Sequence, residues 1–133
     1  MIGCIIQARM GSTRLPGKIM KKLDRENTVL DYVINQIKNS KKIEKIVIAT
    51  TELNEDDVIE KFCNDKKINY FRGSVDDVLD RHYQCAKKYS FDTIVRVTSD
   101  NPIVDPEIID LCIKTYEEGE FDMVTTCNKR SYP

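Results

Sequence analysis

The chain alternates short apolar runs with segments whose apolar residues recur at helical spacing. Five apolar runs have the length and β-branched content of strands, at residues 3–8, 45–50, 68–71, 93–98 and 122–126. Between them, four segments place apolar side chains three and four residues apart, at residues 28–39, 54–63, 74–89 and 105–119. The pattern therefore predicts strands and helices that alternate along the whole chain.

The sequence also carries start and stop signals for these helices. Asn54 and Asp105 are expected to cap the second and fourth helices, and Ser74 with Asp77 forms an S-x-x-D start signal for the third. Gly119 is expected to end the fourth helix. Six residues are expected to form the inner face of the third helix: Val78, Leu79, His82, Cys85, Ala86 and Tyr89.

Strands that alternate with helices form a parallel sheet with helices on both faces, because the crossover connections are right-handed. The expected fold is therefore α/β, a Rossmann-like three-layer α/β/α arrangement with a mostly parallel sheet. In such sheets, ligands bind beyond the carboxyl ends of the strands. The loops after the first and fourth predicted strands are thus the expected places for a site.

The composition fits one compact domain. The chain has 133 residues, of which 41% are hydrophobic and 32% charged, and its formal net charge is −1. A nearly neutral molecule has no basic field to attract nucleic acid, so no nucleic-acid partner is expected. No apolar run approaches roughly 20 residues, so we expect no membrane partner and a cytoplasmic protein. Five scattered cysteines are expected to be reduced and mostly buried: Cys4, Cys63, Cys85, Cys112 and Cys127.

The loop after the first strand has the chemistry of a phosphate site. Residues 7–18 contain three cations and two glycines: Arg9, Arg14, Lys18, Gly11 and Gly17. Glycines let the backbone approach a ligand and present amide hydrogens to it. Arginine makes forked contacts to phosphate oxygens, and lysine supplies a compact point charge. These are the groups that a polyphosphate site requires.

This loop matches neither of two common phosphate motifs. Five residues separate Gly11 from Gly17, and Ile19 follows the lysine, so the loop is not a P-loop. The dinucleotide fingerprint G-x-G-x-x-G is absent as well. From the residues alone, a solvated basic surface loop stays open as the alternative.

Three stretches of the chain resemble one enzyme family. Residues 8–18 read Ala-Arg-x-Gly-Ser-x-Arg-Leu-Pro-x-Lys, which resembles the signature of the cytidylyltransferases that make CMP-sugars. That family includes the acylneuraminate and 3-deoxy-manno-octulosonate cytidylyltransferases. Residues 72–81 and 96–102 are similar to its other marks. The resemblance is closest to the SpsF subgroup of spore coat polysaccharide biosynthesis proteins, and it covers all 133 residues.

The resemblance implies a nucleotide-diphospho-sugar transferase-like fold, with residues 1–133 as the N-terminal nucleotide-binding portion of a cytidylyltransferase-like domain. Because the family's domain is longer, it also implies a truncated chain. The implied enzyme transfers CMP from CTP to an unidentified sugar and releases pyrophosphate, with Mg²⁺ as cofactor, in polysaccharide precursor biosynthesis. A homodimer stays open. So do two other functions, a nucleotide-sugar-dependent glycosyltransferase and a non-catalytic nucleotide-binding fragment.

The resemblance also assigns roles to residues. Arg14 and Lys18 are expected to be catalytic, because they would stabilise the departing pyrophosphate. Arg72 and Thr98 are expected on the cytidine side, with a structural role open for both. The whole expected CTP-binding set is Ala8, Arg9, Gly11, Ser12, Arg14, Lys18, Arg72 and Thr98.

Asp100, which follows the fourth strand, is the expected metal ligand. Mg²⁺ prefers hard oxygen ligands, often one or two carboxylates plus waters, and in the resembling family the aspartate at this place helps bind the metal. From its position alone, Asp100 could instead organise the turn before Pro102. Asp105 is explained as a helix cap and is given no chemistry.

Charged residues in the third helix are expected to be structural. Asp77 and Arg81 have the spacing of an i,i+4 ion pair on a solvated helix start, next to Asp76 and Asp80. His82 lies on an apolar face and is expected to pack rather than to act as a base.

Overall fold

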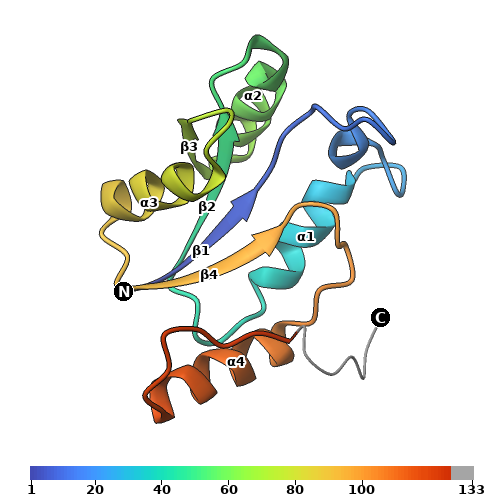
Figure 1. Ribbon diagram of the computed structural model, residues 1–133. Coiled ribbons are helices and arrows are strands. Elements are labelled where there is room, and N and C mark those ends of the chain that lie inside the picture. Colours follow the sequence, from blue (N-terminus) through green and yellow to red (C-terminus); the bar gives the residue numbers. More distant parts are fainter. Residues whose placement is uncertain (127–133) are drawn as a thin grey trace.

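Within residues 1–126, which the structure describes, four parallel strands form one sheet (Figure 1). In this computed structural model the strands are β1 (Ile2–Gln7), β2 (Lys45–Thr51), β3 (Asn69–Gly73) and β4 (Thr93–Thr98), in the order β3-β2-β1-β4. Each lies close to a predicted apolar run. Since β1 pairs with β4, the loops that follow these two strands leave the sheet side by side.

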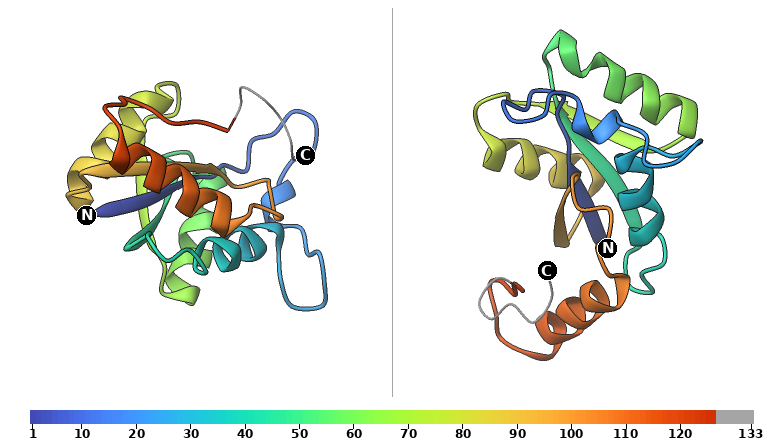
Figure 2. Two further views of the ribbon diagram at one scale, coloured as in Figure 1. Left: turned by 90° about the horizontal axis from the view of Figure 1, so that it is seen from below. Right: turned by 90° about the vertical axis from the view of Figure 1, so that its right-hand side faces the viewer.

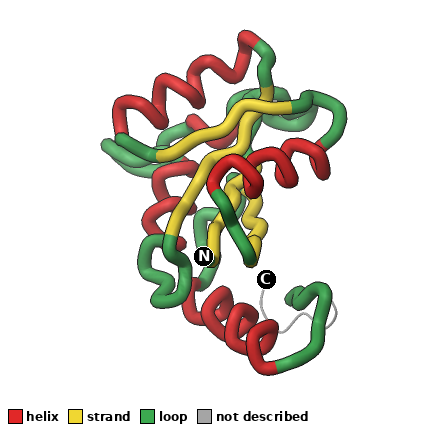
Figure 3. The backbone as a smooth tube through the Cα atoms, turned by 90° about the vertical axis from the view of Figure 1, so that its left-hand side faces the viewer, coloured by secondary structure: helices red, strands yellow, loops and turns green. Residues whose placement is uncertain are grey.

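Helices cover both faces of the sheet, which confirms the predicted three-layer α/β/α fold. On one face lie α1 (Val29–Ile37), α2 (Asp57–Lys66) and α4 (Pro106–Glu118), and on the other lies α3 (Val78–Tyr89) (Figure 2). Figure 3 shows α4 at one end of the molecule, apart from the other helices. Two short 3₁₀ turns, η1 (Lys18–Met20) and η2 (Asn54–Asp56), precede α1 and α2. No helix among residues 1–126 is long and apolar enough to cross a membrane.

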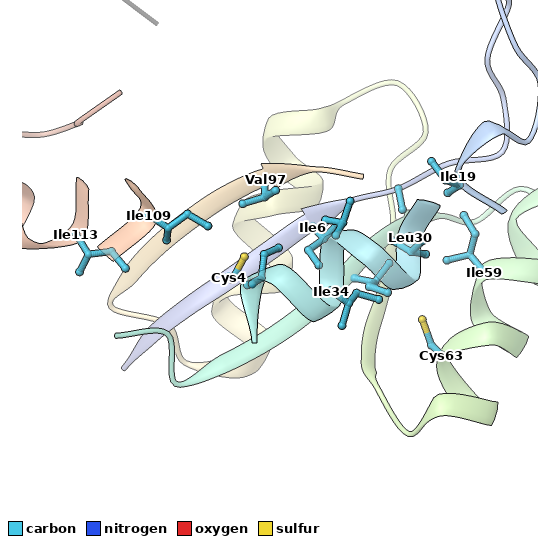
Figure 4. Packing of buried hydrophobic residues seen from close by; sticks show 14 residues of the cluster. Cys4, Ile6, Ile19, Leu30, Ile34, Ile59, Cys63, Val97, Ile109 and Ile113 are labelled. Carbon is cyan, nitrogen blue, oxygen red and sulfur yellow. The ribbon is translucent and has the colours of Figure 1, made fainter. Parts of the chain in front are cut away.

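The central strand β1 contributes to two cores. Cys4 and Ile6 join the larger cluster, where they pack with Leu30 of α1 and with residues of α2 and α4 (Figure 4). Ile5 joins a smaller cluster on the other face, with Cys85 of α3. Successive side chains of a strand point to opposite faces. Because helices cover both faces here, β1 is an apolar run rather than an alternating one.

The cysteines behave as buried small hydrophobes, as predicted. Burial raises the pKa of the Cys4 and Cys63 thiols to about 12 and that of Cys85 to about 11. Cys112 is half-buried, and burial raises its pKa too. All four are free thiols, and Cys127 lies outside the described residues.

Most predicted helix ends are confirmed. Asp105 caps α4 and Asp77 caps α3, each carboxylate accepting a backbone N–H of the first turn. Ser74 Oγ accepts the Asp77 N–H, so the S-x-x-D stretch forms one start motif. Gly119 ends α4, although in an extended conformation. The cap predicted at Asn54 is wrong, because this residue opens the 3₁₀ turn η2 and α2 begins only afterwards.

The predicted inner face of α3 is wrong at one residue. Leu79 is 81% exposed, whereas the Arg81 side chain is buried. Because α3 begins at Val78, Leu79 lies in its first turn at the margin of the apolar stripe.

Residues 122–126 do not form the predicted fifth strand. They are irregular, and the side chains of Met123 and of the preceding Phe121 are exposed. A β-branched apolar run becomes a strand only where its backbone finds a partner in a sheet. This segment pairs with none of the strands in the described part of the chain.

Candidate functional site

The loops that follow β1 and β4 meet through one ion pair. Gln7 and Thr98, the last residues of the two strands, are partners in the parallel ladder. The first loop then runs to Lys18, whose Nζ lies 2.5 Å from Asp100 Oδ2. Two segments that are 82 residues apart in the sequence are thus joined at the carboxyl edge of the sheet. This is the edge at which the sequence predicts a ligand.

The loop after β1 is closed by its own hydrogen bonds. Gly17 donates its N–H to the Met10 carbonyl at 3.0 Å, and Ser12 Oγ accepts the Leu15 N–H at 3.3 Å. Gly17 has a φ of +66°, in the left-handed region that favours glycine. Ile19, in η1, is buried in the core and anchors the far end of the loop. The loop therefore has a defined conformation.

Two arginines of this loop point into solvent. Arg9 and Arg14 are exposed, and within residues 1–126 no hydrogen bond or ion pair engages either guanidinium. Gly11 and Ser12 lie between them in the sequence and are partly exposed. With Lys18, the loop thus presents three cations near a half-exposed backbone, the arrangement that suits an anionic ligand.

Asp100 is an ionised carboxylate aimed at Lys18. The hydrogen bond from Lys18 lowers the pKa of Asp100, burial opposes this, and the Thr98 hydroxyl adds to the lowering. Asn101 stabilises the following turn, since its side-chain oxygen accepts the Ile103 N–H at 3.3 Å. The turn thus has an organiser other than the Asp100 carboxylate.

Asp100 does not belong to a cluster of metal-ligating side chains in the described part of the chain. Among residues 1–126, no group of three or more histidine, cysteine, aspartate and glutamate side chains is placed to hold a metal ion.

The Arg72 guanidinium is engaged in four hydrogen bonds within the protein. Its Nε and one terminal nitrogen donate to the carbonyls of Thr51 and Leu53, each at 2.9 Å. The other terminal nitrogen lies 2.7 Å from Asp57 and 2.5 Å from Glu60. The hydrogen bonds from Arg72 to Glu60 and then to Asp57 raise its pKa. Arg72 therefore ties β3 to the β2 loop and α2.

Ala8 is buried where β1 passes into the loop, and it donates its N–H to the Ala49 carbonyl at 3.0 Å. The loop thus starts from a fixed point of the sheet. The polypeptide on its far side is fixed by Ile19, so both ends of the cationic segment are held.

Comparison with known proteins identifies the family. A family model described as Cytidylyltransferase matches residues 3–131. The chain belongs to the cytidylyltransferase family. This confirms the resemblance that the sequence motifs indicate.

Relatives of this cytidylyltransferase-family chain include proteins from bacteria and archaea. It is 41% identical over 128 residues to the spore coat polysaccharide biosynthesis protein SpsF of Bacillus subtilis, covering 93% of this chain and 53% of that protein. It is 45% identical over 124 residues to an uncharacterised protein of Methanocaldococcus jannaschii, covering 93% and 51%. A solved cytidylyltransferase from Leptospira borgpetersenii superposes with a TM-score of 0.83 at 41% identity, covering 90% and 50%. The chain thus spans about half the length of these relatives.

Two buried charged residues of this cytidylyltransferase-family chain are not indicated by the sequence. Asp56 and Arg81 are 0% and 1% exposed. The predicted Asp77–Arg81 ion pair is wrong, because Asp77 caps the helix and Arg81 donates instead to the Ser74 carbonyl at 3.0 Å. Burial and the charge of Arg9 lower the pKa of Arg81, and Asp56 opposes them. Both residues stand among other charged residues, so no pattern distinguishes them from solvated ones.

His82 is packed, as predicted. It is largely buried on the inner face of α3, and its Nδ1 lies 2.8 Å from the Val78 carbonyl. Burial lowers the pKa of His82, so the ring is neutral at physiological pH. Its neighbour Asp80 accepts a hydrogen bond from Gln84 at 3.0 Å, and Asp76 is exposed, as expected for a solvated helix start.

Proposed function

We propose that residues 1–133 form the N-terminal nucleotide-binding portion of a Mg²⁺-dependent sugar cytidylyltransferase. In the reaction, a sugar hydroxyl oxygen bonds to the α-phosphorus of CTP and the bond to pyrophosphate breaks. The hydroxyl proton passes to solvent, and a CMP-sugar is released. The observation that carries this proposal is the contact of Lys18 with Asp100, because it brings the cationic loop and a candidate metal ligand to one edge of the sheet.

The three cations are the proposed triphosphate ligands. Arg9 and Arg14 are exposed and can turn toward phosphate oxygens. Lys18 would exchange the Asp100 carboxylate for a phosphate. Arg14 and Lys18 would then stabilise the charge that develops on the departing pyrophosphate, which is how proteins catalyse phosphoryl transfer with little covalent chemistry. Gly11 and Ser12 would supply backbone and hydroxyl donors.

Asp100 is the proposed Mg²⁺ ligand. Its lowered pKa keeps it ionised, and its side chain is 42% exposed at the edge of the sheet. A single carboxylate suffices where waters and substrate phosphates complete the coordination. When bound, Mg²⁺ would neutralise phosphate oxygens of CTP.

The nucleoside is proposed to lie over Ala8 and Thr98. Ala8 is buried directly after the last residue of the central strand, and the Thr98 hydroxyl is beside Asp100. Arg72 would have to leave four contacts to reach a ligand, so we assign it to the fold rather than to cytidine.

We also propose a physiological context. The name of the Bacillus subtilis relative, a spore coat polysaccharide biosynthesis protein, supports a role in supplying an activated sugar for a polysaccharide. A cytoplasmic location is proposed because CTP is a cytoplasmic substrate. A homodimer is proposed because β4 has a strand on one side only within residues 1–126, and an open edge can pair with another chain.

The test is a ligand panel on this chain. The shift in melting temperature is measured with CTP, ATP, GTP, UTP and a UDP-sugar, each with and without Mg²⁺, and the dissociation constants follow by calorimetry. We expect CTP with Mg²⁺ to stabilise most. The double variant Arg14→Ala with Lys18→Ala should abolish the shift. The control Lys38→Ala with Lys61→Ala removes two exposed lysines elsewhere and should bind normally.

Two results would overturn the proposal. Stabilisation by the UDP-sugar alone would favour a glycosyltransferase. Normal CTP binding by the Arg14→Ala, Lys18→Ala variant would show that the phosphates bind elsewhere.

A further inference from the structure

Asp56 is a charged side chain with no exposed surface. It ends the short turn η2 on the chain between β2 and α2. Taking a carboxylate out of water costs several kcal/mol unless partners compensate for it. The other buried carboxylate among residues 1–126, that of Asp31, has such partners in the Thr28 cap of α1 and in Lys66. The partners of Asp56 therefore show what its burial achieves.

One partner of Asp56 is the backbone of the cationic loop. Oδ1 accepts the Met10 N–H at 2.7 Å. The carbonyl of the same residue, Met10, accepts the Gly17 N–H at 3.0 Å and so closes the loop. Met10, the residue at which the loop closes, is thus held by the Asp56 carboxylate. The adjacent Glu55 carboxylate also lies against the loop, since a Cβ on Gly11 would come within 2.8 Å of Glu55 Oε1.

The other partners hold the carboxylate in place. Oδ2 accepts a hydrogen bond from the Thr51 hydroxyl at the end of β2, so the sheet fixes the side chain. Asp56 also opposes the charge of buried Arg81, which in turn feels the charge of Arg9. Within the described chain, Arg81 Nε has no hydrogen-bond partner. The negative charge of Asp56 therefore offsets the charge of a cation that the fold buries.

We infer that Asp56 is a positioning residue, which fixes the backbone of residues 10–17 so that their amides and cations are ordered before a polyphosphate binds. This inference rests on the proposed function, because it names the residue that shapes the proposed phosphate loop. A loop ordered in advance loses less conformational entropy when the ligand binds.

Three variants separate positioning from charge and from stability. Asp56→Ala removes the acceptor for the Met10 N–H. Asp56→Asn removes the charge but keeps an oxygen that can accept the same N–H. Thr51→Val removes the hydroxyl that donates to Asp56 Oδ2 and leaves the residues of the loop unchanged. Asp65→Ala, on the exposed face of α2, is the matched control.

Loop order in the ligand-free protein is the first readout. Backbone ¹⁵N relaxation should show fast motion of residues 11–17 in Asp56→Ala, with the strands unchanged, and near-wild-type order in Asp56→Asn and Asp65→Ala. The affinity for CTP with Mg²⁺ is the second. It should fall at least tenfold in Asp56→Ala, severalfold in Thr51→Val, and less than threefold in Asp56→Asn.

The outcomes distinguish this inference from the proposed function. An equally ordered loop in Asp56→Ala, or an equal loss of order in Asp56→Asn, would overturn the inference whatever CTP does. A lower melting temperature with unchanged order and affinity would assign Asp56 to stability alone, which also overturns it. If Asp56→Ala does not fold, the Thr51→Val variant decides: a loop as ordered as in the wild type, with wild-type affinity for CTP, would overturn the inference. Absence of CTP binding by the wild type would overturn the proposed function, and the relaxation data would still decide the role of Asp56.

Discussion

Replacing Lys18 with methionine tests separately the two proposed functions of its charge, the ion pair with Asp100 and the binding of a phosphate. In the ligand-free protein the ammonium forms an ion pair with Asp100, and both side chains are partly exposed, at 32% and 42%. Exposed pairs of this kind stabilise a protein by no more than about 1 kcal/mol. For a domain of this size, Lys18→Met should therefore lower the melting temperature by no more than roughly 5 °C. The fold should survive.

The effect on nucleotide binding should be larger. A hydrogen bond to a charged group contributes about 1.5–3 kcal/mol. The wild type gives up the ion pair with Asp100 when Lys18 turns to a phosphate, which offsets up to about 1 kcal/mol of that gain. The net loss in Lys18→Met then lies between about 0.5 and 3 kcal/mol, which corresponds to a roughly 2- to 160-fold weaker affinity for CTP with Mg²⁺.

Isothermal titration calorimetry at constant ionic strength measures this loss, and thermal unfolding measures the stability. Lys61→Met changes the net charge equally from an exposed site on α2 and should bind CTP as the wild type does. Binding by Lys18→Met within twofold of the wild type would refute the assignment of Lys18 to the phosphates. An equal loss of affinity in both variants would show that the effect comes from net charge rather than from the position of Lys18.

Further measurements test the acid–base, backbone and thiol features of the fold. The hydrogen bond from Lys18 lowers the pKa of Asp100 from 3.8, so the stabilisation by this pair is present at neutral pH and is lost as the pH falls through the lowered pKa. Titration by NMR should find the pKa below 3.8 and nearer to it in Lys18→Met; no difference would contradict the pairing. Gly17→Ala should lower the free energy of unfolding in urea by about 1–2 kcal/mol, and Gly17→Asn by less, since asparagine tolerates a positive φ; equal losses would argue against backbone strain. Alkylation mapped by mass spectrometry should spare the three buried thiols of the native protein, those of Cys4, Cys63 and Cys85. Their rapid modification would contradict the burial.

The sheet and its helices could be predicted because their signals are local. The apolar run of β1 and the caps at Asp77 and Asp105 act over a few residues, so the sequence alone reveals them. The run at residues 122–126 has the same local signal but no partner strand in the described chain. Pairing depends on distant residues, which a local pattern does not contain. The same limit explains Leu79, whose exposure depends on where α3 starts.

The candidate site divides in the same way. That the cationic loop and Asp100 lie at one edge of the sheet could be predicted, because both loops follow parallel strands and a motif marks each; the structure adds that β1 pairs with β4. Their roles as ligands stay predictions. The buried layer of Asp56 and Arg81 could not be predicted, because charged residues are almost always exposed and each stands among others that are. Only the tertiary structure shows that these two side chains face inward.

The ion pair between Lys18 and Asp100 also limits which ligand fits the site. A bare polyphosphate could attract Lys18 but would meet the Asp100 carboxylate beside it. A bare cation could attract Asp100 but would leave the ammonium of Lys18 without its partner. A polyphosphate that carries a divalent cation offers an anion to one side chain and a cation to the other at the same time. Such a ligand would exchange the pair for two favourable contacts rather than break it, so under the proposed function the metal complex of a nucleotide should suit this edge of the sheet better than either component alone.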